Sequence, residues 1–222
     1  MTRALRAERV EPASGEARSA LVLLHGYGAN GKDLIGLADT LGPHLPDTLF
    51  LAPDAPERCD GAPFGLQWFP IPWLDGSSEE MARDGLLRAA SDLDRFLDGV
   101  MVDEDLLPEQ VAVLGFSQGT MMALHVAPRR EEPVAAIVAF SGRLLEPDLL
   151  IDEARSRPPV LLLHGDGDDM VPVQALPEAA GALEAAGWTE VFAHVMKGTG
   201  HGIAPDGLSV ALAFLRDRLG VA

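Results

Sequence analysis

Short apolar segments alternate along the chain with longer segments in which apolar residues recur at helical spacing. The short segments are rich in Val, Leu and Ala, which is typical of strands buried on both faces of a parallel sheet. They cover residues 20–24, 48–52, 111–116, 134–140, 160–163 and 191–195. Because strands and helices alternate, we predict an α/β fold with a mostly parallel central sheet and helices on both faces.

Two of the longer segments carry clear helix signals. One apolar face repeats at helical spacing before residue 101, and Ser77 with Glu80 can form a capping box in front of it. Its members are Leu86, Ala90, Leu93, Leu97 and Val100. Near the end of the chain, Pro205 suits a first helical turn and Gly220 suits a helix stop. The apolar face between them consists of Leu208, Ala211, Leu212, Leu215 and Leu219.

The main irregular stretch covers residues 53–78 and is rich in proline and large apolar side chains. These side chains are Phe64, Trp68, Phe69, Ile71, Trp73 and Leu74. A long loop with so much apolar surface is more typical of a pocket wall or lid than of a solvated connection. No internal repeat or linker interrupts the pattern, so we expect residues 1–222 to form a single domain without a large cap domain.

Composition narrows the possible partners. Acidic residues outnumber basic residues 34 to 17, so the formal net charge is −17. This charge repels nucleic acid and anionic lipid, and we expect neither as a partner. The one cysteine, Cys59, excludes an intrachain disulfide, and we interpret it as inert or incidental. The chain shows neither a signal peptide nor an apolar run long enough to span a bilayer, which predicts a cytoplasmic protein without integral membrane association.

The sequence Gly-Phe-Ser-Gln-Gly at 115–119 lies between a predicted strand and a predicted helix. A G-x-S-x-G match by itself is a weak signal. In this context it predicts a nucleophile elbow, a sharp turn that holds the hydroxyl of Ser117 at the end of the sheet. Glycine on either side of the turn lets the strand and helix approach closely.

Three further polar motifs follow predicted strands, at the edge where α/β sheets bind ligands. They begin at His25, His164 and Gly198. Ser117, an acid and His201 occur in the order that α/β-hydrolases use for nucleophile, orienting acid and general base. Asp168 is our candidate for the acid, with Asp166 and Asp169 as alternatives in the same loop. The backbone N–H groups of Gln118 and Tyr27 are candidate oxyanion donors.

Other functions for these polar residues fit less well. His25 and His164 are more typical of structural hydrogen bonds to turns, and His44, His125 and His194 of packing or surface positions. The aspartates of the Asp168 loop lack the spacing of a calcium loop, and the histidines lack a paired zinc motif. We therefore predict neither a metal nor a cofactor.

Together these motifs resemble the phospholipase/carboxylesterase family, which includes acyl-protein thioesterases. The resemblance rests on Leu-His-Gly-Tyr-Gly at 24–28, the serine turn, His-Gly-Asp-Gly-Asp-Asp-Met-Val-Pro at 164–172 and Gly-His at 200–201. Gln-Trp-Phe at 67–69 supports it. The family pattern His-Gly-x-x-Asp selects Asp168 as the acid. The resemblance implies an α/β-hydrolase that cleaves carboxylic esters or thioesters and has a shallow acyl groove.

We therefore predict a serine carboxylesterase for small-molecule esters with short to medium acyl chains. An acyl-protein thioesterase or a lysophospholipase remains an alternative. A ligand-binding module on the same scaffold is the alternative outside enzymes. A homodimer is possible. The residues expected to contact the acyl chain are Phe64, Trp68, Trp73, Leu144, Met170 and Val171, with Leu145 as a further candidate.

Overall fold

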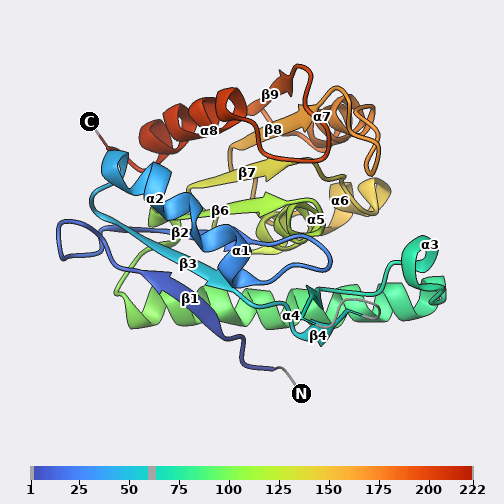
Figure 1. Ribbon diagram of the computed structural model, residues 1–222, viewed down its shortest axis with the longest axis horizontal. Coiled ribbons are helices and arrows are strands. Elements are labelled where there is room, and N and C mark those ends of the chain that lie inside the picture. The colour runs from blue at the N-terminus through green and yellow to red at the C-terminus, as the bar shows by residue number, and fades with distance from the viewer. Residues whose placement is uncertain (1–2, 60–63, 222) are drawn as a thin grey trace.

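The computed structural model describes residues 3–59 and 64–221, and a mixed sheet forms its centre (Figure 1). In these residues the sheet has seven strands in the order β1-β3-β2-β6-β7-β8-β9. Every neighbouring pair is parallel except β1 with β3, which is antiparallel. In that order the strands are Ala7–Val10, Thr48–Pro53, Ser19–Leu24, Val111–Phe116, Ala136–Phe140, Val160–Gly165 and Val191–Met196.

Helices cover both faces of the sheet (Figure 1). The first face holds α4, α5, α6 and α7, which are Glu79–Asp103, Gln118–Val126, Pro147–Glu153 and Ala175–Ala185. The second holds α1, α2 and α8, which are Gly31–Ile35, Leu37–Leu41 and Pro205–Arg218. Short 3-10 helices span Gly42–His44, Pro108–Gln110 and Ala127–Arg129.

Two buried clusters hold these layers together, and strand β2 contributes to both. Val22 and Leu24 pack in the cluster under α4 and α5, whereas Leu21 and Leu23 pack in the cluster under α2 and α8. Successive side chains of a strand point to opposite faces, so a strand without polar positions has apolar contacts on both sides. The unbroken apolar run at 20–24 is explained by this arrangement.

The six predicted strands are present, with ends that agree to within two residues. The strand expected at 134–140 begins at Ala136. The pattern missed β1, whose residues are mostly exposed because it forms an antiparallel edge. The predicted cap is wrong by one residue: Ser78, not Ser77, precedes helix α4, and its hydroxyl accepts from the N–H of Met81. The N–H of Ser77 donates to Asp75 instead.

The stretch 53–78 contains a short hairpin and one helical turn. Strands β4 (Glu57–Arg58) and β5 (Leu66–Gln67) form the hairpin, and α3 (Pro72–Asp75) follows it. Residues 60–63 lie outside the described residues. The segment is fixed to the body of the molecule, because Trp68, Phe69 and Ile71 are buried in the cluster under α4. In the described ranges, no cap domain lies over the sheet (Figure 1).

None of the described helices is both long and apolar enough to traverse a lipid bilayer.

Candidate active site

Ser117 occupies a strained turn between β6 and α5. Its backbone has φ 54° and ψ −113°, a conformation that L-residues rarely adopt, and its N–H donates to the carbonyl of Phe140 at 2.9 Å. The neighbouring glycines are required by space. A Cβ atom on Gly119 would lie 1.9 Å from the carbonyl oxygen of Leu24, and one on Gly115 would lie 2.4 Å from the nitrogen of Thr120. The turn is therefore a nucleophile elbow in its geometry.

The structure brings Ser117, His201 and Asp168 together from three different loops. The hydroxyl of Ser117 lies 3.0 Å from Nε2 of His201, which is in the connection between β9 and α8. On the other side of the ring, Nδ1 of His201 lies 2.8 Å from Oδ2 of Asp168, which follows β8. This chain of two hydrogen bonds is the arrangement of a nucleophile, its base and an orienting acid.

The carboxylate of Asp168 is fully buried, yet it is held in the charged form. Burial by itself raises the pKa of Asp168, but hydrogen bonds from the N–H of Val171, from His201 and from the N–H of Met170 outweigh burial. The net pKa of this carboxyl is below its ordinary value. Both backbone groups donate to Oδ1 at 2.9 Å, which leaves Oδ2 for His201.

Neither alternative acid is placed against His201. Asp166 accepts a hydrogen bond from the N–H of Gly198 at 2.7 Å and so supports the loop that leads to His201. Asp169 is exposed. Of the three aspartates, Asp168 is the one that the structure places against the ring of His201.

His25 and His164 are buried and bond to nearby backbone. Nδ1 of His25 donates to the carbonyl of Gly26 at 2.8 Å, and its Nε2 accepts from the N–H of Ala55 at 2.9 Å. Burial lowers the pKa of His25, which is consistent with a neutral ring that has one donor and one acceptor nitrogen. Nε2 of His164 donates to the carbonyl of Val171 at 2.8 Å and lies 3.3 Å from Asp168. His164 thus braces the loop that carries the acid.

Gln118 has a second role that its position after the serine did not reveal. Its fully buried side chain accepts from the N–H of Trp68 at 2.9 Å and donates to the carbonyl of Phe69 at 2.7 Å. The residue therefore joins α5 to the segment 66–71. Its own N–H lies in the first turn of α5, where helix N–H groups have no intrahelical acceptor. The nearby Tyr27 lies in the turn after β2 and packs against the cluster under α4.

Two hollows flank the serine on opposite faces of the sheet edge. One is an apolar groove of about 170 Å³. We call it the α4-side groove, and its walls include Phe69, Ile71, Trp73, Leu86, Met121 and Leu145. The other is a cavity of about 290 Å³, the α1-side cavity. Its walls include Gly26, Asp33, Leu34, Leu37, Phe116 and Ile203.

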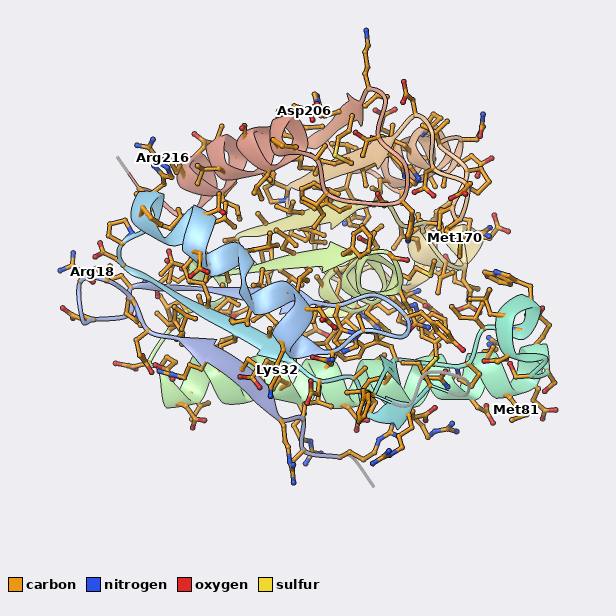
Figure 2. The ribbon with its side chains drawn as sticks, viewed as in Figure 1. Arg18, Lys32, Met81, Met170, Asp206 and Arg216 are labelled. Atoms are coloured by element: carbon orange, nitrogen blue, oxygen red, sulfur yellow. The ribbon has the colours of Figure 1, made fainter. Side chains whose placement is uncertain are left out.

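Most of the residues predicted to contact the acyl chain lie outside the α4-side groove. Trp68 is fully buried, with its indole N–H bonded to the carbonyl of His25, so it supports the site from below. Leu144 and Val171 are core residues, each 8% exposed. Phe64 is 90% exposed and Met170 55% exposed, and Figure 2 shows Met170 on the outer surface. These five residues do not line the α4-side groove.

Trp73 and Leu145, which were also predicted to contact the acyl chain, do line the groove. Phe69, Ile71, Leu86 and Met121 were not predicted to do so, although the first two belong to the segment that was expected to form a wall. Helical periodicity marked Leu86 only as a buried position. The apolar periodicity of a helix is the same whether a side chain packs against the core or lines an open groove.

Within the described residues, no group of three or more His, Cys, Asp or Glu side chains is placed to hold a metal ion. Cys59 is buried in the hairpin segment.

Comparison with known proteins decides the family. The family model described as Phospholipase/Carboxylesterase matches residues 5–219. The chain belongs to the phospholipase/carboxylesterase family. The predictions of the family, the α/β-hydrolase fold and carboxylic ester hydrolase activity are thereby confirmed.

Individual proteins similar to this chain agree with this assignment. The crystal structure of esterase PE8 is 44% identical, with a TM-score of 0.92 over 98% of this chain and 100% of that one. Acyl-protein thioesterase 1 of Saccharomyces cerevisiae is 28% identical over 96% of this chain and 96% of its own. Esterase YpfH of Escherichia coli is 26% identical over 90% of this chain and 83% of its own.

Proposed function

We propose that the protein hydrolyses carboxylic esters through an acyl-enzyme on Ser117. His201 takes the hydroxyl proton at Nε2 as the serine oxygen attacks the ester carbonyl. The same imidazolium then gives this proton to the departing alcohol, and the acyl group stays on Ser117. Water enters, His201 takes its proton, and attack on the acyl-enzyme releases the acid and restores the serine.

Asp168 acts on the base. Its carboxylate accepts from Nδ1–H of His201, so the lone pair of the ring is at Nε2 and faces Ser117. The negative charge also stabilises the imidazolium that forms during attack. The lowered pKa of Asp168 supports this role, because it keeps the carboxylate ionised at neutral pH.

The oxyanion of the tetrahedral intermediate is assigned to the backbone N–H groups of Gln118 and Tyr27. The helix-start position of Gln118 supports this assignment, because its N–H lacks an acceptor within α5. The clamp from Gln118 to Trp68 and Phe69 holds the donor and the groove wall in one rigid unit.

The α4-side groove is the proposed acyl site. It begins beside Met121, whose N–H donates to the carbonyl of Ser117, and it continues along Phe69 to Trp73. At its outer end Arg83 pairs with Glu146 at 3.3 Å, and both residues line the groove. Charged groups at this end disfavour a long alkyl chain, which supports short to medium acyl groups. We also propose that segment 53–78 acts as a pocket wall within a single domain of residues 1–222; the groove positions of Phe69, Ile71 and Trp73 support the wall.

The hydrogen-bonded Ser117–His201–Asp168 chain is the observation that carries the proposal. The test is hydrolysis of 4-nitrophenyl esters from acetyl to palmitoyl by the wild-type protein and by Ser117→Ala. We expect kcat/KM to be highest between butyryl and octanoyl, and the variant to lose at least ~10³-fold. Ser91→Ala, an exposed position on α4, is the matched control. Retention of wild-type turnover by Ser117→Ala would refute the mechanism.

Thioester hydrolysis is the second candidate, because the relative from Saccharomyces cerevisiae is an acyl-protein thioesterase. An oxygen ester and a thioester of the same acyl group distinguish the two activities, since only the leaving atom differs. Lysophospholipase activity is tested by the same panel extended to a lysophospholipid. A binding module would leave Ser117 unlabelled by a fluorophosphonate. A cytoplasmic location and a homodimer remain part of the proposal.

A further inference from the structure

The α1-side cavity is larger than the acyl groove, and the reaction above does not yet use it. It lies on the opposite face of the sheet edge, because Leu34 and Phe116 belong to the cluster under α2 and α8. The groove residues Phe69 and Met121 belong to the cluster under α4. An ester that spans Ser117 therefore has a separate hollow for each of its two halves.

Neighbours of the reacting groups line the cavity. A Cβ atom on Gly26 would lie 3.3 Å from Cβ of Ser117, so Gly26 lies beside the serine. The ring of Phe116 lies 5.0 Å from the ring of His201, and Ile203 follows that histidine by two residues. The wall of the cavity is thus built from the immediate neighbours of both the nucleophile and the base.

The chemistry of acyl transfer indicates which half of the ester each hollow receives. Nε2 of His201 must protonate the leaving oxygen or sulfur, so this atom departs on the side of the imidazole. Phe116, whose ring packs against this imidazole, lines the α1-side cavity, and so does Ile203. The acyl half stays bonded to Ser117 and extends toward the groove beyond Met121.

The charge in this cavity is negative. Among the described residues that line it, Asp33 is the one carboxylate, and neither Lys nor Arg is present. His25 also lines the cavity, and its nitrogen atoms are both committed to backbone partners. Lys32 is exposed, and Figure 2 shows its side chain extending toward β1. A cationic group in the cavity therefore meets a carboxylate without a competing cation in the wall.

We propose that the α1-side cavity binds the alcohol or thiol half of the substrate and that Asp33 favours leaving groups that carry an ammonium group. The proposal rests on the proposed function, since it assigns the second half of the same substrate. Leu34, Leu37 and Ile203 supply the apolar wall for the carbon atoms of the leaving group, and Asp33 supplies the charge.

Two isosteric substrates test the charge. Butyrylcholine carries a quaternary ammonium, and 3,3-dimethylbutyl butyrate has the same shape without the charge. The leaving oxygens of the two esters differ in reactivity, so each kcat/KM is divided by the second-order rate constant for hydroxide. We expect the corrected ratio to favour the cation about two- to five-fold at low salt, as for an exposed ion pair, and to approach one at 0.5 M NaCl.

Asp33→Asn removes the charge and keeps an oxygen that can accept from the N–H of Asn30, which is the capping bond of Asp33 in α1. We expect this variant to bring the corrected ratio to about one. Asp39→Asn, at an exposed position in α2 that does not line the cavity, removes the same charge and should keep the wild-type ratio. Equal corrected ratios in the wild-type protein, in Asp33→Asn and in Asp39→Asn would overturn the role of Asp33.

Leu37→Trp tests whether the leaving group binds in the α1-side cavity. The larger side chain fills part of the cavity, so we expect kcat/KM to fall at least five-fold more for 3,3-dimethylbutyl butyrate than for methyl butyrate. An equal loss on both esters would overturn the assignment of the cavity. Failure of the ester-hydrolase function itself would look different, because the wild-type protein would then hydrolyse neither butyrate.

Discussion

Replacement of Asp168 by asparagine tests the catalytic arrangement most directly, because the structure dictates how the new amide must sit. The N–H groups of Met170 and Val171 both donate to Oδ1. The amide oxygen of asparagine can accept these two bonds, whereas its NH2 group cannot. The oxygen therefore stays at Oδ1, and the NH2 group points at Nδ1 of His201.

The result is a base with its proton on the wrong nitrogen. Nδ1 of His201 must become an acceptor for the new NH2 group, so the ring carries its hydrogen on Nε2 and cannot take the proton of Ser117. We expect kcat to fall about 10⁴-fold, which corresponds to about 5.5 kcal/mol of transition-state stabilisation. The fold should survive, since both backbone hydrogen bonds to residue 168 are kept.

The assay is kcat on 4-nitrophenyl butyrate near neutral pH, with folding checked by circular dichroism. Asp166→Asn is the matched control, because its amide oxygen can still accept from the N–H of Gly198. We expect this control to retain activity within about three-fold, as a structural position should. A small effect of Asp168→Asn together with a large effect of Asp166→Asn or Asp169→Asn would refute the assignment of the acid.

Two stability predictions follow from buried polar groups. Gln118→Ala removes the partners of the N–H of Trp68 and the carbonyl of Phe69, so urea denaturation should show a loss of about 2–5 kcal/mol. The control Gln110→Ala also loses two hydrogen bonds to backbone groups, but at an exposed site, so it should lower the free energy of unfolding by less than about 1 kcal/mol. Equal losses in the two variants would contradict the reasoning. Burial, with the nearby Arg129 cation, lowers the pKa of His125 to about 4. Between pH 6.5 and 4 the unfolded state binds a proton at this residue that the folded state does not bind. As the pH is lowered through this range, the free energy of unfolding therefore decreases by about 1.4 kcal/mol per pH unit. His125→Leu should therefore reduce the difference in unfolding free energy between pH 7 and 4.5 by about 2–3 kcal/mol. An unchanged difference would show that His125 is not the group responsible.

The sequence by itself was sufficient for the sheet and for the residues at its edge. Strand β2 reads as an unbroken apolar run because both of its faces are buried, and this signal depends only on neighbouring positions. Chain order then brings the ends of parallel strands to one edge. That rule was enough to select Ser117 and His201 as candidates, and the family pattern was needed to prefer Asp168 over two adjacent aspartates.

The edge strand and the helix cap were harder to predict for physical reasons. Strand β1 is antiparallel and largely exposed, so its four residues carry no strong apolar signal. Ser77 and Ser78 are equally good caps by residue type. In the structure the hydroxyl of Ser78 caps α4, whereas Ser77 lies in the preceding turn, where its N–H bonds to Asp75 of α3.

Only the tertiary structure decided which side chains line the groove and the cavity. Trp68 and Trp73 are five residues apart in one loop, yet the first is fully buried and the second is 65% exposed at the groove. The difference arises from contacts distant in sequence: the backbone of Leu66 pairs with Ala29, and Gln118 holds the backbone of Trp68. Local periodicity reports burial of a position but not the partner that buries it. The three residues of the proposed catalytic chain could therefore be selected as candidates from the sequence, whereas the groove and the cavity exist only where distant segments pack together.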